Sequence, residues 1–408
     1  MKLSLMGRIA MAILASLALG LGMSACGGGT IGYMWVLGDQ FNQITGFKVD
    51  NYTGNLTQII GSPFASNGVN PVSIVVKPGG RYVYVVNQGT GGGQVTNPIS
   101  GVTTTVKETS GGIAVYSVGG DGVLTFQQTY ATQGSVPMWA QFDGSGTYLY
   151  VLDKFSGRND SRGAITAFSA DASTGRLTLI TNQGVLSGGL PTPNFEVGPS
   201  PSMIKTTGGC LFTLDTGDQT IFPYSFGSNG QLALTTPGSI PISASNLTSI
   251  NGSGSTIILT DGGANRILPY TVGSACNLVI ATGGSVANIA GTSNPIYSLI
   301  DNSGKYLYVL NQSTTSTGIT TPFSSISAFN LIPQLTVIPG SPYKVGSNPV
   351  CIVEDTSNQY VYTSNRNDGT VTGLGINSTT GELSGLARGS TFPASGQGGC
   401  LVLSGAVN

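Results

Sequence analysis

The chain has 408 residues, only 8% of them charged, with a formal net charge of −1 and no histidine. Such a balance offers no basic face to neutralise phosphates, which excludes nucleic acid as an expected partner. The absence of histidine excludes Ser-His-Asp and Cys-His catalysis, and zinc or copper sites that need imidazole ligands.

The first 25 residues predict a lipoprotein signal peptide. Lys2 and Arg8 precede an apolar run over residues 9–23, and small residues then lead to Cys26. A basic start, an apolar core and a small-residue cleavage site are typical of export signals. We expect Cys26 to be lipidated and residues 26–32 to form a flexible tether. An ordinary signal peptide with an incidental cysteine is the alternative.

This signal predicts a bacterial cell-envelope protein, periplasmic or facing the outer membrane. No later segment of the sequence has the roughly 20 apolar residues that a spanning helix needs. Lipid is therefore the only membrane attachment that we expect. The expected partner is a small ligand or an envelope protein, and we expect a monomer.

Residues 71–87 predict two short strands joined by a turn at Pro78-Gly79-Gly80, because Val, Ile and Tyr suit a pleated surface. The same pair returns at 137–153, 201–215, 295–311 and 349–365, and more weakly at 246–261. A third strand of the form Ile/Val-x-x-Phe/Tyr and a fourth marked by Leu follow each pair. Seven third strands occur, beginning at Ile44, Ile113, Ile165, Ile221, Ile267, Ile326 and Val371.

Four antiparallel strands per repeat predict an all-β, seven-bladed β-propeller in a single domain over residues 33–408. The last repeat stops after one strand at residues 400–403, and residues 33–60 supply the three strands that it lacks. We therefore expect the N- and C-terminal strands to pair and close the ring, which leaves no large open sheet edge. Antiparallel geometry places the long loops on one face, the candidate working surface.

Acidic and amide residues end the second strands on that face. Asp153, Asp215 and Asp261 lie at equivalent places in three successive blades. They could form a carboxylate arc for a hard cation or the polar rim of a ligand pocket. The alternative is that each side chain forms an Asx-turn that begins the next loop. Asn87, Asn311 and Asn365 at the same place favour that alternative, since an Asx-turn accepts either residue.

Basic residues gather in the loop after Asp153. Lys154, Arg158 and Arg162 make this the most charged short segment of the chain, and Arg366 occupies the place of Lys154 in its own repeat. Guanidinium groups on a rim suit a carboxylate or phosphate ligand, although a solvated loop is the interpretation that the sequence favours. No metal or cofactor is expected, because no phosphate-binding glycine loop occurs in a strand-to-helix context.

Three further features carry weaker expectations. Ser202 and Lys205 match a Ser-x-x-Lys motif, but that motif needs a helix and lies here on a predicted strand, so we reject it. Trp139 could line the channel mouth or pack between blades. Buried free thiols are expected at the remaining cysteines, because a chain of this size does not need disulfides: Cys210, Cys276, Cys351 and Cys400.

The repeated Gly-Ser-Pro-Phe/Tyr at 61–64 and 340–343, with Tyr-Val-Tyr-Val-Val-Asn at 82–87, resembles the lactonase-type seven-bladed propellers. That family is similar to 6-phosphogluconolactonases and carboxymuconate cyclising enzymes. Its active members carry His-Pro-His and Gly-Pro-Arg-His runs at two inner strands. This sequence reads Val-Pro-Met at 136–138 and Gly-Pro-Ser-Pro at 198–201. The resemblance therefore implies the fold and transfers no catalytic residue.

Two functions remain open from the sequence. The first is a ligand- or protein-binding module without the family's histidine chemistry. The second is a lactone hydrolase in which Glu196, with Arg158 or Arg162, replaces histidine. Nothing in the sequence places Glu196 beside either arginine, and the first function is the one the sequence favours.

Overall fold

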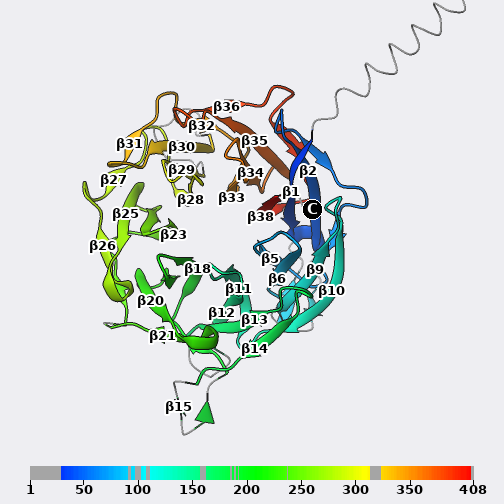
Figure 1. The fold of residues 1–408 in the computed structure, drawn as a ribbon, viewed down its shortest axis with the longest axis vertical. Coiled ribbons are helices and arrows are strands. Elements are labelled where there is room, and N and C mark those ends of the chain that lie inside the picture. Colours follow the sequence, from blue (N-terminus) through cyan, green and yellow to red (C-terminus); the bar gives the residue numbers. More distant parts are fainter. Residues whose placement is uncertain are drawn as a thin grey trace, which may run out of the picture.

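The computed structural model describes residues 29–90, 93–96, 103–106, 111–156, 162–183, 186–187, 190–191, 193–236, 238–312 and 323–405. Cys26 and Arg158 lie outside these residues. Seven antiparallel sheets stand in a ring around a central channel (Figure 1). This arrangement is the predicted seven-bladed β-propeller. Within the described part of the chain, no helix is long and apolar enough to cross a membrane.

Each blade has the predicted order of four strands, from the channel to the rim. The innermost strands of blades 1 to 7 are β38 (Gly398–Gly405), β5 (Pro71–Val76), β11 (Ser135–Phe142), β18 (Pro201–Thr207), β23 (Leu247–Ser253), β28 (Pro295–Ile300) and β33 (Pro349–Glu354). The second strands, in the same blade order, are β1 (Thr30–Gly38), β6 (Tyr82–Asn87), β12 (Tyr148–Phe155), β19 (Cys210–Asp215), β24 (Thr256–Asp261), β29 (Tyr306–Asn311) and β34 (Tyr360–Asn365).

The fourth strand of each blade is more exposed than the third and, except in blade 2, shorter. Third strands are β2 (Gln43–Asp50), β9 (Gly112–Val118), β13 (Ala164–Ala170), β20 (Thr220–Phe226), β25 (Arg266–Val272), β30 (Ser325–Asn330) and β35 (Thr370–Ile376). Fourth strands are β3 (Leu56–Gln58), β10 (Leu124–Ala131), β14 (Leu177–Ile180), β21 (Leu232–Leu234), β26 (Leu278–Ile280), β31 (Thr336–Val337) and β36 (Leu383–Gly385).

A two- or three-residue strand in six blades pairs with the third strand on its way back to the channel: β4 (Phe64–Ala65), β17 (Phe195–Glu196), β22 (Ile240–Pro241), β27 (Val286–Ala287), β32 (Tyr343–Lys344) and β37 (Thr391–Pro393). Two hairpins extend from the loops, β7 (Gly93–Thr96) with β8 (Thr103–Val106) and β15 (Leu186–Ser187) with β16 (Leu190–Pro191). Three 3₁₀ turns, η1 (Asp39–Phe41), η2 (Ser228–Gly230) and η3 (Ser274–Cys276), complete the elements.

Both chain ends build blade 1, as predicted. Strand β38 pairs antiparallel with β1, with Val402 opposite Trp35. The blue and red ends of the chain therefore lie together in the ring (Figure 1). This pairing gives every inner strand a partner on its rim side and removes the open edge that a linear array of blades would leave.

The hydrophobic core lies between neighbouring blades. One cluster joins Tyr84 and Val86 of blade 2 to Phe142, Leu149 and Val151 of blade 3, all of them buried. Alternation along the strands sends one set of side chains to each neighbouring sheet. The ring is thus held by sheet-on-sheet packing at each junction between two blades.

Hydrogen bonds from aromatic residues reinforce five of these junctions. In four of them a second-strand tyrosine donates its hydroxyl to a glycine carbonyl in the outer turn of the next blade. Trp35 donates its ring N–H to Gly122 at 3.2 Å in the fifth. The tyrosine pairs are Tyr84 with Gly175 at 2.8 Å, Tyr150 with Gly230 at 3.2 Å, Tyr308 with Gly381 at 3.0 Å and Tyr362 with Gly54 at 2.7 Å.

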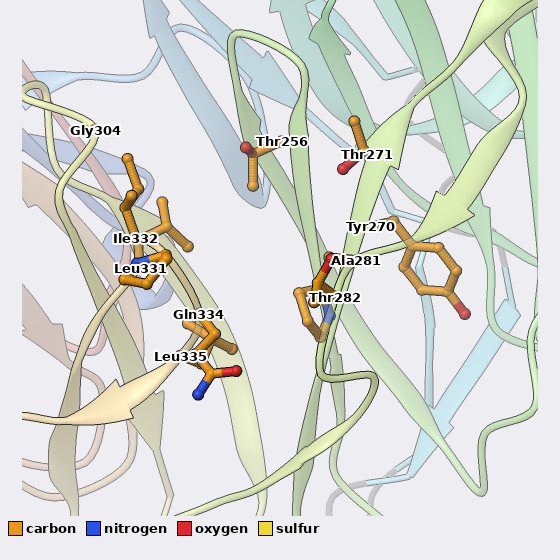
Figure 2. A pocket seen from close by; sticks show the side chains of 12 residues that line it. Thr256, Tyr270, Thr271, Ala281, Thr282, Gly304, Leu331, Ile332, Gln334 and Leu335 are labelled. Atoms are coloured by element: carbon orange, nitrogen blue, oxygen red, sulfur yellow. The ribbon is translucent and has the colours of Figure 1, made fainter.

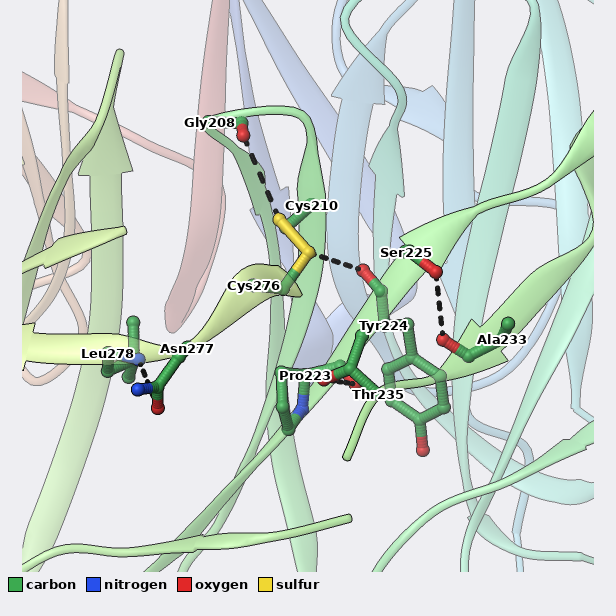
Figure 3. The surroundings of a disulfide bond; sticks show 10 residues. All are labelled: Gly208, Cys210, Pro223, Tyr224, Ser225, Ala233, Thr235, Cys276, Asn277 and Leu278. Carbon is green, nitrogen blue, oxygen red and sulfur yellow. Dashed lines mark hydrogen bonds between the residues drawn. A yellow bond between two sulfur atoms is a disulfide. The ribbon is translucent and has the colours of Figure 1, made fainter. Parts of the chain in front are cut away.

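At the junction between blades 4 and 5, a disulfide links the two blades in place of such a hydrogen bond. Cys210 occupies the first place of β19, where other blades have tyrosine, and it is bonded to Cys276 in η3 of the next blade, with Cα atoms 5.8 Å apart (Figure 3). Cys351 and Cys400, on the neighbouring inner strands β33 and β38, form a second disulfide with Cα atoms 5.1 Å apart. The prediction of free thiols was wrong, because the ring places these cysteines of adjacent blades within bonding distance.

Candidate functional site

The loop-rich side of the junction between blades 3 and 4 contains a groove with a volume of about 300 Å³. We call it the Arg162–Glu196 groove. One wall comes from Arg162, Phe195 and Glu196 of blade 3, and the other from Phe222 and Tyr224 on β20 and residues 232–234 on β21 of blade 4. Most of this surface is apolar, and the charged pair lies on one side of it.

Backbone pairing brings the two charged residues together. The short strand β17 pairs with β13, so that Glu196 lies opposite Ala164. The pairing continues as Val197 donates to the Gly163 carbonyl at 3.1 Å and Gly163 donates to the Gly198 carbonyl at 2.9 Å. Arg162 precedes this ladder directly. A Cβ at Gly163 would lie 2.3 Å from Pro201, so glycine is needed for the close approach.

The geometry of the pair leaves it open to solvent. Arg162 Nη1 lies 3.8 Å from Glu196 Oε2, and their side chains are 61% and 32% exposed. The Tyr224 hydroxyl donates to the Glu196 carbonyl oxygen at 2.7 Å and holds the segment against blade 4. Burial raises the pKa of Tyr224, and the nearby negative charge of Glu196 adds to the effect. Tyr224 therefore remains a neutral donor, while the Glu196 carboxylate and the Arg162 guanidinium face the cavity.

The three predicted strand-end aspartates are buried within their own blades. Asp215 accepts the N–H of Ser200 at 2.8 Å and that of Gly217 at 3.1 Å. Asp261 accepts four hydrogen bonds, from the amides of Ser245, Asn246 and Ala264 and from Nε of Arg266. The bonds to Gly217 and Ala264 are the local, turn-starting contacts expected of an Asx residue. The bonds from Ser200, Ser245 and Asn246 fasten the chain segment that enters the inner strand, and Arg266 forms an ion pair with Asp261 from the third strand of the same blade.

Asp153 is the least satisfied of the three. Thr166 donates its hydroxyl to Asp153 Oδ2 at 2.6 Å. Burial raises the pKa of Asp153 to about 6, against the lowering effect of its hydrogen bonds. Among the described residues, no three Cys, Asp or Glu side chains gather in a way that could hold a metal ion. The arc for a hard cation is therefore not assembled in this part of the chain.

The remaining predicted residues lie apart from the groove. Arg366 forms an ion pair with Asp39 of blade 1. Lys154 is exposed, with its ammonium 5.5 Å from the centre of the Phe155 ring. Of the eight predicted ligand-binding residues, the structure thus brings Arg162 and Glu196 together, and Arg158 lies outside the described residues.

A second cavity marks the junction between blades 5 and 6, where the described residues form neither a hydrogen bond from a second-strand tyrosine nor a disulfide. Thr256 and Ile258 stand where other blades have tyrosine or another aromatic residue. A volume of about 260 Å³ remains between Thr256, Tyr270 and Thr271 of blade 5 and residues 331–335 of blade 6 (Figure 2). Its lining has no charged side chain, so it lacks the acid, base or ion pair of the Arg162–Glu196 groove.

Comparison with known proteins identifies the family. The model of the family "Lactonase, 7-bladed beta-propeller" matches residues 30–189 and 99–398. The chain belongs to this lactonase propeller family. No curated protein matches its sequence.

Two solved structures have the same fold as this chain, although their sequence identity to it is low. A periplasmic gluconolactonase, PpgL, from Pseudomonas aeruginosa is 16% identical, with a TM-score of 0.67 over 92% of this chain and 100% of that one. A candidate 6-phosphogluconolactonase from Bacteroides fragilis is also 16% identical, with a TM-score of 0.68 over 93% and 99% of the two chains.

Proposed function

We propose that this lactonase propeller hydrolyses small lactones at the Arg162–Glu196 groove. The observation that carries the proposal is the carboxylate and guanidinium lying 3.8 Å apart beside an apolar cavity of about 300 Å³. A volume of this size suits a ligand of one sugar or aryl ring. Family membership and the likeness to a gluconolactonase support a lactone over other esters.

The reaction needs a base and a group that stabilises the oxyanion. In the proposed mechanism the Glu196 carboxylate takes a proton from a water molecule, whose oxygen adds to the lactone carbonyl. The Arg162 guanidinium stabilises the negative charge that develops on the carbonyl oxygen. The ring C–O bond then breaks, and the leaving oxygen takes the proton back from Glu196. The product is an open-chain hydroxy acid, and no histidine is needed.

The test is a panel of sugar and aryl lactones, with hydrolysis followed as acid release. We expect turnover by the wild type and a loss of about 100-fold or more in Glu196→Gln, because a positioned base contributes about 10²–10⁴-fold. Glu382→Gln is the matched control, since Glu382 is a half-buried glutamate in the outer turn of blade 7, away from the groove. Equal rates in both variants would contradict the proposed site.

A binding module without turnover is the second candidate function. The complete lack of histidine, which the family's active members use, favours it. Saturable binding of a lactone in the groove, weakened by Arg162→Ala and accompanied by no acid release, would support this second function over hydrolysis. Lipid attachment through Cys26 and a place in the cell envelope remain predictions of the sequence under both functions.

A further inference from the structure

The central channel contains another cavity, of about 320 Å³, at the end opposite the long loops. Inner strands β18, β23, β28, β33 and β38 line it, and these strands surround the centre of the ring in Figure 1. Leu299, Ile352 and Val402 give apolar walls. Lys205 and Glu354 add an amine and a carboxyl. We call this space the channel cavity.

Lys205 is a half-buried cation without a partner in the described part of the chain. Its side chain makes no ion pair or hydrogen bond with any residue that the structure describes. Burial lowers the pKa of Lys205 to about 8, so the ammonium form still dominates at pH 7. An unpaired ammonium that is partly removed from water is costly, and an anionic group beside it would offset that cost.

Glu354 faces the same cavity from blade 7, three blades away from Lys205. Its Oε2 accepts the N–H of Asn302 at 2.7 Å, while Oε1 is buried and has no partner. Burial, and then the negative charges of Asp301 and Asp355, raise the pKa of Glu354 to about 8. At pH 7 this carboxyl is therefore mostly neutral, and it can donate a hydrogen bond as well as accept one.

The other acidic group of the lining is already satisfied by its own turn. Asp301 accepts the amides of Lys305 at 2.8 Å and Tyr306 at 2.7 Å, and its second oxygen accepts the amide and hydroxyl of Ser303. No further cation is needed to balance it locally. Lys205 and the unpaired oxygen of Glu354 are thus the amine and the carboxyl of the lining that are left for a ligand.

Aromatic rings occupy the channel at the cavity's inner end. Tyr297 of blade 6 lines the cavity, and its ring centre lies 6.2 Å from that of Trp139 in blade 3. Blades 3 and 6 are not neighbours, so this contact reaches across the channel. Trp139 accordingly packs inside the channel, and the pair narrows the passage between the cavity and the long-loop face.

We propose that the channel cavity binds a small hydroxycarboxylate, with its carboxylate against the Lys205 ammonium and a hydroxyl against Oε1 of Glu354. The two groups lie on opposite walls, which suits a ligand with different polar groups at its two ends. Apolar walls between them accommodate a carbon chain of sugar-acid size. The site does not depend on hydrolysis at the Arg162–Glu196 groove, because it is defined by binding alone.

The test is calorimetric titration of the protein at pH 7 with D-gluconate, and with D-glucitol and hexanoate as matched probes. Gluconate has both a carboxylate and hydroxyls, whereas each control lacks one of them. We expect gluconate to bind most tightly and Lys205→Met to weaken it by about tenfold or more, as for loss of a charge-assisted hydrogen bond. Arg162→Met should leave this affinity unchanged.

The pH dependence gives an independent measurement. Affinity for gluconate should fall from pH 7 to pH 9, because Lys205 loses its charge and Glu354 becomes negative. Glu354→Gln should bind gluconate at pH 7 and lose less affinity at pH 9. Unchanged binding in Lys205→Met, loss of binding in Arg162→Met alone, or equal binding of glucitol would each overturn the proposal.

Discussion

The Arg162–Glu196 groove and the channel cavity each combine a basic residue with a glutamate, in opposite ways. In the groove the two charges lie 3.8 Å apart and remain solvated. In the channel, Lys205 and Glu354 face one cavity from opposite walls, and burial shifts the pKa of each toward the neutral form. An exposed ion pair changes stability little, whereas buried groups without partners reduce it.

This difference separates two uses of charge. The groove pair is open to water and can meet a substrate at the surface. The channel groups reduce the stability of the fold unless a ligand compensates them. The difference can be tested by changing one site at a time and measuring activity and stability together.

The largest expected effect is on kcat/KM, and it distinguishes Glu196 in the groove from Glu354 in the channel. Glu196→Gln should lower kcat/KM for a lactone by about 100-fold or more, because it removes the base. Glu354→Gln should leave kcat/KM within about twofold, since Glu354 lies in the channel and away from the groove. Acid-release rates for the two variants check this. A loss in Glu354→Gln that equals the loss in Glu196→Gln would place the chemistry in the channel.

The next effect is on thermal stability. Lys205→Met keeps the length and apolar stem of the side chain and removes a half-buried unpaired charge. At pH 7 without ligand we expect Tm to rise by about 1–3 °C. Calorimetric scans of the wild type and the variant measure this. A lower Tm in Lys205→Met would mean that the ammonium has a stabilising partner.

Stability should also depend on pH through the channel. Glu354 has a native pKa of about 8, above its unfolded value. Its contribution to the free energy of unfolding is therefore complete at low pH and is lost as pH rises toward 8. Asp153 has a native pKa of about 6, so its contribution to the free energy of unfolding is lost at a lower pH than that of Glu354. Between pH 6 and 8 the free energy of unfolding should therefore fall, on the order of 1 kcal/mol, in the wild type. Urea titrations of Glu354→Gln should show a flatter profile, and a profile as steep as that of the wild type would contradict the assignment.

The smallest expected effect belongs to the groove. Arg162→Met removes one member of an exposed pair, so the free energy of unfolding should change by less than about 0.5 kcal/mol. The same urea titrations provide the value. A change of several kcal/mol would show that the pair holds blades 3 and 4 together, and would contradict its description as an exposed ion pair with little effect on stability.

The sequence predicted the ring well because the fold repeats its own signal. The Tyr-x-Tyr second strands and the Leu-marked fourth strands recur often enough to count blades, and the incomplete last repeat indicated that β1 and β38 pair. The Cys210–Cys276 disulfide was missed because each cysteine resembles a buried apolar residue when taken alone. Its signal was the presence of Cys210 where Tyr82 and Tyr148 stand in other blades.

The two sites were harder to predict because neighbouring strands assemble them. Glu196 reaches Arg162 through the two-residue strand β17, which is too short to leave a periodic pattern. In the sequence, Lys205 stands out only as part of a Ser-x-x-Lys motif. A lysine on an inner strand of a charge-poor propeller was itself a signal, since such a side chain must lie in or near the channel.

The most direct test of the account is kcat/KM for one hydrolysed lactone in Arg162→Ala, Glu196→Gln and the double variant. If both groups stabilise one transition state, the double variant should be about as slow as the slower single variant, because residues that act as a unit are not additive. A double variant that hydrolyses the lactone at the wild-type rate would contradict the assignment of the groove as the active site.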